Sequence, residues 1–288
     1  MSPARTAVPL WLDHASVAVP SLHDAIALLD ARLGLRATVS PGDPGRHSRV
    51  YLDRGYVEVA SGPQGRGWTL AGFFVRFENP TALRRHLDST GLRHRFSEYA
   101  GVDGRWDDVE IDAGTVPLPI LVRRTQPPAI ARTWPPPLGE AHRCGARTLD
   151  AVQIIVRDLD LAVATYTRLV GDRGIAVTDR DGVRRAEVRL ASGRILLAEG
   201  ESPGIAAIVL RVGSLPETTS VVGPLTGSPI AWLDPAITQG VQLGFVESLA
   251  SESLAAEDNS GRHDAGGTSQ ARNGRASRRP ANNRQRAR

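Results

Sequence analysis

Residues 12–34 read LDHASVAVPSLHDAIALLDARLG, and residues 149–171 read LDAVQIIVRDLDLAVATYTRLVG. The two stretches align without a gap and are identical at 7 of 23 positions, so the chain is built from a repeated unit. They differ at one chemically informative position, where the first copy has His14 and the second has Ala151. An imidazole of the first copy is therefore missing from the second.

The repeat extends into the strands that follow each helix. Residues 50–58 read VYLDRGYVE, residues 188–196 read VRLASGRIL, and a glycine in each stretch marks a tight turn between two strands. Glu58 falls opposite Leu196 in this alignment. A carboxylate of the first copy thus also lacks a counterpart in the second.

Helix and strand signals divide the chain into four similar units. In the first unit, the apolar strand 12–19 precedes a helix that Ser21 and Asp24 begin as a capping box and that Gly34 ends. The fourth unit is degenerate, with a short helix expected near residues 218–222. A curved sheet of this size cannot bury its concave face alone. The sequence predicts an α+β fold of repeated βαβββ modules that form cupped mixed sheets in two tandem domains. Further helix starts are expected at Asn79, Pro80 and Asp158.

Composition suggests the domain boundaries. We expect a first two-unit domain at residues 1–125, a proline-rich connector at 126–147, and a second, degenerate two-unit domain at 148–248. Residues 249–288 have too few apolar side chains to offset the entropy of ordering, so they are predicted to be a disordered Arg-rich tail.

The net charge lies in that tail. Of the 35 basic and 31 acidic residues, residues 249–288 hold eight Arg and four acidic residues, which leaves 27 of each sign in the rest of the chain. The predicted folded part is neutral, and nucleic acid is not an expected partner.

Residue usage excludes several classes of chemistry. Every basic residue is Arg, so Schiff-base and P-loop chemistry that needs a lysine is absent. Cys144 is the only cysteine, which excludes an intrachain disulfide. No apolar run is long enough to span a membrane and the first residues do not resemble a signal peptide, so we expect a cytoplasmic protein with no membrane partner.

Several of these motifs resemble one known family. The strand that opens LDH, the capped helix that ends LG, the strand YVEV and the connector segment HRCGA are similar to those of the vicinal oxygen chelate superfamily. The resemblance is specifically to its glyoxalase-like domain, of the glyoxalase, bleomycin resistance and extradiol dioxygenase type. It implies that both predicted domains are glyoxalase-like.

The resemblance implies a cupped sheet around a divalent metal that chelates two adjacent oxygens of a substrate. His14 and Glu58 carry over as metal ligands and as catalytic residues, and Fe, Mn, Ni or Zn suits this pair. A catalytic centre needs about three protein ligands. The aligned positions of the other three units are apolar or small, so a site without metal is equally supported. In that case the two side chains would act as a general base and acid.

Four further residues are candidates for substrate binding. Arg49 could bind a carboxylate, His47 precedes a strand entry, and Trp106 and Phe74 could form an apolar wall. His86, between charged residues on a predicted helix, is expected to be solvated.

Two functions follow. The first is an enzyme that acts on a small oxygenated metabolite through a metal at His14 and Glu58, by lyase, isomerase or dioxygenase chemistry. The alternative is a metal-free protein that binds or sequesters a small molecule without catalysis. A homodimer is as well supported as a monomer.

Overall fold

A computed structural model describes residues 8–39, 46–62, 67–101, 104–112, 114–126, 142–180, 182–217, 219–226, 228–238 and 240–248. The chain divides into two units, Met1–Ser248 and Leu249–Arg288, and all described residues belong to the first. The predicted tail and most of the predicted connector lie outside the described residues.

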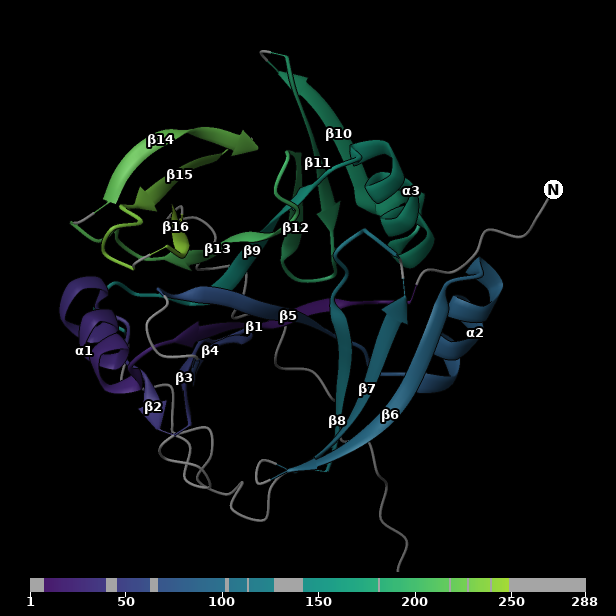
Figure 1. The fold of residues 1–288 in the computed structure, drawn as a ribbon, viewed down its shortest axis with the longest axis horizontal. Coiled ribbons are helices and arrows are strands. Elements are labelled where there is room, and N and C mark those ends of the chain that lie inside the picture. Colours follow the sequence, from purple (N-terminus) through teal and green to yellow (C-terminus); the bar gives the residue numbers. More distant parts are fainter. Residues whose placement is uncertain are drawn as a thin grey trace, which may run out of the picture. The chain divides into compact units, whose positions relative to one another are not determined.

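The first half of the described chain forms one eight-stranded mixed sheet with two helices on its outer side (Figure 1). The strand order is β2-β3-β4-β1-β5-β8-β7-β6, in which β1 pairs in parallel with β4 and β5 with β8. The elements are β1 (Trp11–Val19), α1 (Leu22–Leu33), β2 (Thr38–Val39), β3 (His47–Tyr51), β4 (Tyr56–Ser61), β5 (Thr69–Arg76), α2 (Pro80–Thr90), β6 (Arg93–Gly101), β7 (Gly104–Asp112) and β8 (Ile120–Gln126).

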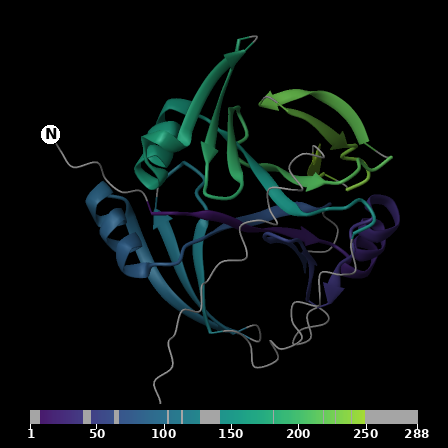
Figure 2. The ribbon, with the colours of Figure 1, turned by 180° about the vertical axis from the view of Figure 1, so that it is seen from behind.

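The second half repeats this arrangement, with strand order β10-β11-β12-β9-β13-β16-β15-β14 (Figures 1 and 2). The two mixed sheets of βαβββ-type modules confirm the predicted fold class. The elements are β9 (Thr148–Val156), α3 (Leu159–Val170), the 3-10 turn η1 (Asp172–Gly174), β10 (Ile175–Arg180), β11 (Val183–Arg189), β12 (Arg194–Glu199), β13 (Gly204–Val212), β14 (Thr219–Thr226), β15 (Ser228–Leu233) and β16 (Gln242–Glu247).

The helix boundaries follow the predicted signals. The Ser21 side chain accepts a hydrogen bond from the backbone N–H of Asp24, and Gly34 ends α1 in the left-handed conformation with φ 65°. Asn79 caps α2 and Asp158 caps α3 in the same way. No helix within the described ranges is long and apolar enough to cross a membrane.

The helix expected near residues 218–222 is wrong. Residues 219–226, which read TSVVGPLT, form strand β14 instead. Two β-branched valines favour a strand, and Gly223 with Pro224 cannot continue a helix. In the described residues, the fourth unit therefore lacks the helix that the other three have.

The two sheets exchange backbone hydrogen bonds through equivalent hairpin turns. The N–H of Leu12 in β1 donates to Ser192 O at 2.8 Å, in the turn between β11 and β12. At the equivalent place, the N–H of Leu149 in β9 donates to Arg54 O at 3.4 Å, in the turn between β3 and β4. The two copies of the repeat therefore contact each other through equivalent residues.

Helices α2 and α3 also join the two halves. The expectation that His86 is solvated is wrong, because this side chain is buried and its Nε2 lies 2.8 Å from Leu169 O at the end of α3. The hydroxyl of Tyr166 on α3 donates to Pro117 O at 2.8 Å. His86 therefore has a structural contact on the helical side, away from the concave face.

Each strand of the first sheet turns one side to the helices and the other to the concave face. Ala15 and Val17 of β1 and Phe73 and Val75 of β5 are buried in the main hydrophobic core on the helical side. Since side chains alternate along a strand, the residues between them project from the concave face. That face carries the polar side chains singled out in the sequence.

Candidate functional site

The candidate site begins with His14 on β1. Strand pairing places His14 opposite Tyr56 of β4 and Phe74 of β5. The imidazole stacks between these two rings, with centroid distances of 4.3 Å to Tyr56 and 3.9 Å to Phe74 and interplanar angles of 10° and 11°. His14 and Phe74 therefore lie in contact on the concave face.

Glu58 lies on the same face of the sheet, two residues after Tyr56 on β4. It pairs with Ser16 of β1, two residues from His14, and with Arg49 of β3. His47 is two residues before Arg49 and so shares this face. His14 and Glu58 are diagonal neighbours rather than direct partners.

Trp106 also lies on the concave face, on strand β7 in the other half of the first sheet. Phe74 pairs with Ile120 of β8, and Trp106 of β7 pairs with Arg124, four residues further along β8. An even separation along a strand preserves the face. All six predicted site residues thus lie on the concave face of the first sheet.

One ring nitrogen of His14 contacts a carboxylate, and the other has no hydrogen-bond partner among the described residues. Nδ1 lies 2.8 Å from Oδ2 of Asp13, and the residue is only 6% exposed. An ionised carboxylate only accepts hydrogen bonds, so Nδ1 carries a proton, and in the neutral form of the ring the lone pair lies at Nε2. Among the described residues, Nε2 has no hydrogen-bond partner.

Glu58 is held by its own partners. Nε and Nη2 of Arg49 donate to Oε2 at 3.2 and 3.1 Å, and Ser16 Oγ donates to Oε1 at 3.3 Å. Within the described ranges no hydrogen bond or ion pair joins Glu58 to His14. The carboxylate that contacts the imidazole is Asp13, which the sequence reasoning did not single out.

Burial changes the acidity of two groups on this face. It raises the pKa of Tyr56 well above its ordinary value, although the Arg49 guanidinium opposes this shift. It also raises the pKa of Asp108 on β7, with help from the charge of Glu110, while a protonated His14 would act in the opposite direction.

Residues 12–170, more than half of the chain, match the family described as glyoxalase-like domain. The chain belongs to this family. The resemblance to the vicinal oxygen chelate superfamily is thereby confirmed.

Solved structures show the same fold as this glyoxalase-like protein. The Mn(II)-bound glyoxalase from Novosphingobium aromaticivorans has a TM-score of 0.60 at 11% identity, covering 84% of this chain and 83% of its own. Homoprotocatechuate 2,3-dioxygenase from Arthrobacter globiformis has a TM-score of 0.57 at 15% identity, covering 85% and 81%. A hypothetical protein from Staphylococcus aureus has a TM-score of 0.57 at 10% identity, covering 83% and 99%. No curated protein matches the sequence.

The described side chains of this glyoxalase-like protein do not supply a three-ligand metal centre. His14 is oriented as a metal-binding histidine would be, with a carboxylate on its second nitrogen. On the neighbouring strands, Gly72 of β5, which pairs with Ser16, has no side chain, and Ile120 of β8, which pairs with Phe74, is apolar. Glu58 is occupied by Arg49. Across the part of the chain that the structure describes, no three His, Cys, Asp or Glu side chains gather as a metal site.

The concave face of the second sheet is filled. Gly244 lies on β16, and a methyl group there would lie 2.7 Å from Cζ3 of Trp232 and 2.8 Å from Cγ2 of Ile230. The Trp232 ring thus occupies the space that a side chain at position 244 would need. A separate apolar cluster lines this face: Ala151, Leu196, Ala207, Val209, Ile230, Trp232 and Val246.

The aspartate shared by the two copies has different partners. Asp13 contacts His14, whereas Asp150 accepts hydrogen bonds from Arg194 at 2.8 Å and Arg211 at 2.7 Å. Arg194 pairs with Ala151 as Tyr56 pairs with His14. In the second copy an ion-pair network therefore replaces the histidine contact.

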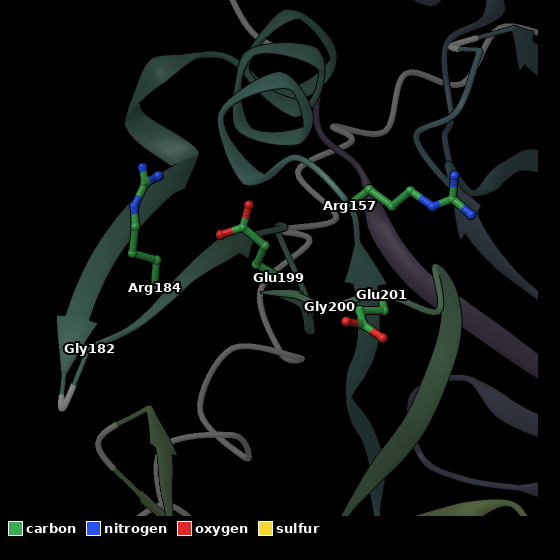
Figure 3. A pocket seen from close by; sticks show the side chains of 6 residues that line it. All are labelled: Arg157, Gly182, Arg184, Glu199, Gly200 and Glu201. Carbon is green, nitrogen blue, oxygen red and sulfur yellow. The ribbon is translucent and has the colours of Figure 1, made fainter.

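A depression with a volume of about 650 Å³ lies on the second sheet (Figure 3). Figure 3 shows that Arg157 extends away from Glu199 and Arg184. Arg184 pairs with Asp160 at 2.6 Å. The lining therefore mixes opposite charges and includes none of the predicted site residues: Arg157, Gly182, Arg184, Glu199, Gly200 and Glu201.

Proposed function

We propose that the concave face of the first sheet binds a small oxygenated molecule and that His14 exchanges a proton with an oxygen of that molecule. The observation that carries this proposal is the state of the imidazole. Its Nδ1 is fixed by Asp13, and its Nε2 has no partner among the described residues. A proton acceptor must lie within hydrogen-bond reach of the group it serves, and the face around Nε2 is where such a ligand would sit.

Neighbouring side chains suit this role. The rings of Tyr56 and Phe74 fix the plane of the imidazole, and Phe74 is only half-buried, which leaves apolar surface for a planar ligand. Asp13 is a positioning residue, because it acts through the imidazole.

The proposal does not depend on a metal. A divalent ion at His14 and Glu58 is what the resemblance implies, but Glu58 would have to release Arg49 and Ser16 and a third ligand would still be needed. We therefore favour binding in which Glu58 keeps Arg49 in place. A purely sequestering protein would use the same face without proton exchange.

Catechol is a suitable test probe, since it is neutral and has two adjacent oxygens. We expect catechol to shift the His14 imidazole resonances saturably, with or without EDTA. Catechol affinity, read from the shift of the neighbouring Tyr56 and Phe74 ring resonances, should weaken in His14→Gln and stay unchanged in His23→Gln, whose side chain is exposed on α1. Absence of any effect on His14 would refute binding at this face. A response that EDTA abolishes and Fe or Mn restores would refute the metal-independent form.

A further inference from the structure

Arginines on the concave face of the first sheet fall into two groups. Arg49, Arg93 and Arg95 each contact a carboxylate, at 3.1 Å from Glu58, 2.8 Å from Asp112 and 2.6 Å from Glu110. In the described chain, Arg76 and Arg124 have no carboxylate partner, although both are exposed.

These two arginines stack on tryptophans instead. The guanidinium carbon of Arg76 lies 5.3 Å from the ring centroid of Trp11, and that of Arg124 lies 4.5 Å from that of Trp106. Stacking occupies a flat face of the guanidinium and leaves the N–H donors, which lie in its plane, available to an anion. Each arginine is thus held in place while its hydrogen-bonding edge remains open.

Their positions place them close to each other and to His14. Arg76 pairs with Val122 on the parallel strand β8, and Arg124 is two residues further along that strand. Standard strand spacing then separates their Cα atoms by about 8 Å, within the joint reach of two arginine side chains. Arg76 also lies two residues from Phe74, whose ring stacks on His14.

We propose that Arg76 and Arg124 together bind a carboxylate of the ligand, so that the molecule bound at His14 is a planar oxygenated acid. This rests on the proposed function, since it adds a second contact to the same ligand. Arg124 and Arg76 bind the acid group while the oxygenated end lies at Nε2 of His14. Arg49, a candidate from the sequence for binding a carboxylate, is buried and contacts the carboxylate of Glu58.

Salicylate and salicylamide form a matched pair of probes, because they share a ring and a hydroxyl and differ in one charge. At an ionic strength of about 20 mM, where exposed charges are weakly screened, salicylate should bind about tenfold or more tightly than salicylamide. Arg76→Gln and Arg124→Gln should each remove much of this ratio, and the double variant should bring it to about one. Affinity for salicylamide should stay unchanged, which also reports that the variants are folded.

Arg84→Gln is the matched control. Arg84 stacks on Phe96 at 4.1 Å, but it lies on α2 at the outer side of the sheet, so its removal should leave the ratio unchanged. Equal affinity of the wild type for both probes, or a ratio that survives in the double variant, overturns the carboxylate site and leaves the proposed function intact. Failure of both probes to bind overturns both proposals.

Discussion

Gly244→Ala tests whether the second concave face is packed shut. The added methyl group would lie 2.7 Å from Trp232 and 2.8 Å from Ile230, and both residues are buried. Gly244 does not have a positive φ, so its backbone accepts alanine. Any loss of stability therefore reports steric conflict rather than backbone strain.

The expected magnitude follows from two opposing effects. Inserting a methyl group into a packed core costs about 1–3 kcal/mol, while replacing glycine inside a strand otherwise gains about 0.5–1 kcal/mol. We expect a net loss of about 1–2 kcal/mol in the free energy of unfolding. Trp232→Ala alone should cost about 3–5 kcal/mol because it leaves a cavity.

A double-mutant cycle measured by urea unfolding separates these effects. In the Trp232→Ala background the space is vacant, so Gly244→Ala should cost nothing or stabilise, a coupling of about 1–3 kcal/mol. Gly72→Ala is the control, because a methyl group there meets Phe74 at an ordinary 3.5 Å. A neutral Gly244→Ala that shows no coupling to Trp232 would refute the reasoning that confines the site to the first sheet.

Three further perturbations test the surroundings of the site. Gly55→Ala should cost about 2 kcal/mol or more in thermal or urea unfolding, because φ is 82° and the methyl group would meet the Asp13 carbonyl; wild-type stability would contradict this. Tyr166→Phe should cost about 1–3 kcal/mol, since it leaves the Pro117 carbonyl without its hydroxyl donor, and an unchanged urea midpoint would argue against that contact. Burial, with nearby carboxylates, raises the pKa of Asp108 in the folded protein above its ordinary value of 3.8. The folded state therefore favours the protonated side chain, whose contribution to the free energy of unfolding is complete below pH 3.8 and is lost as the pH rises through the raised pKa. Asp108→Asn should therefore stabilise the protein at neutral pH and weaken the pH dependence of unfolding above pH 3.8, and destabilisation at pH 7 would reverse this assignment.

Local signals in the sequence predicted most of the architecture. Ser21 and Gly34 determine where α1 begins and ends through their own backbone contacts, so nearby residues suffice to predict them. The repeat identified His14 and Glu58, and the register of β1 and β4 then shows both on one face. The helix predicted in the fourth unit was wrong because the helix pattern at residues 218–222 is weak and the same stretch contains two valines, which favour a strand.

Contacts between distant strands explain what the sequence could not reveal. Trp232 fills the second concave face only because β15 pairs with β16 opposite Gly244, a register that no short motif specifies. Glu58 is occupied because Arg49 faces it across a hairpin. Asp13 had a usable signal, the Leu-Asp pair retained in both copies, but Asp150 shows that the same residue takes other partners.

The most direct measurement is the tautomeric state of His14, read from long-range 1H–15N correlations of its imidazole at a pH where the ring is neutral. We predict a proton on Nδ1 and a bare Nε2, with the Nε2–H form appearing in Asp13→Ala. A proton on Nε2 in the wild-type protein would contradict the account, because the nitrogen that is meant to receive the ligand's proton would already carry one.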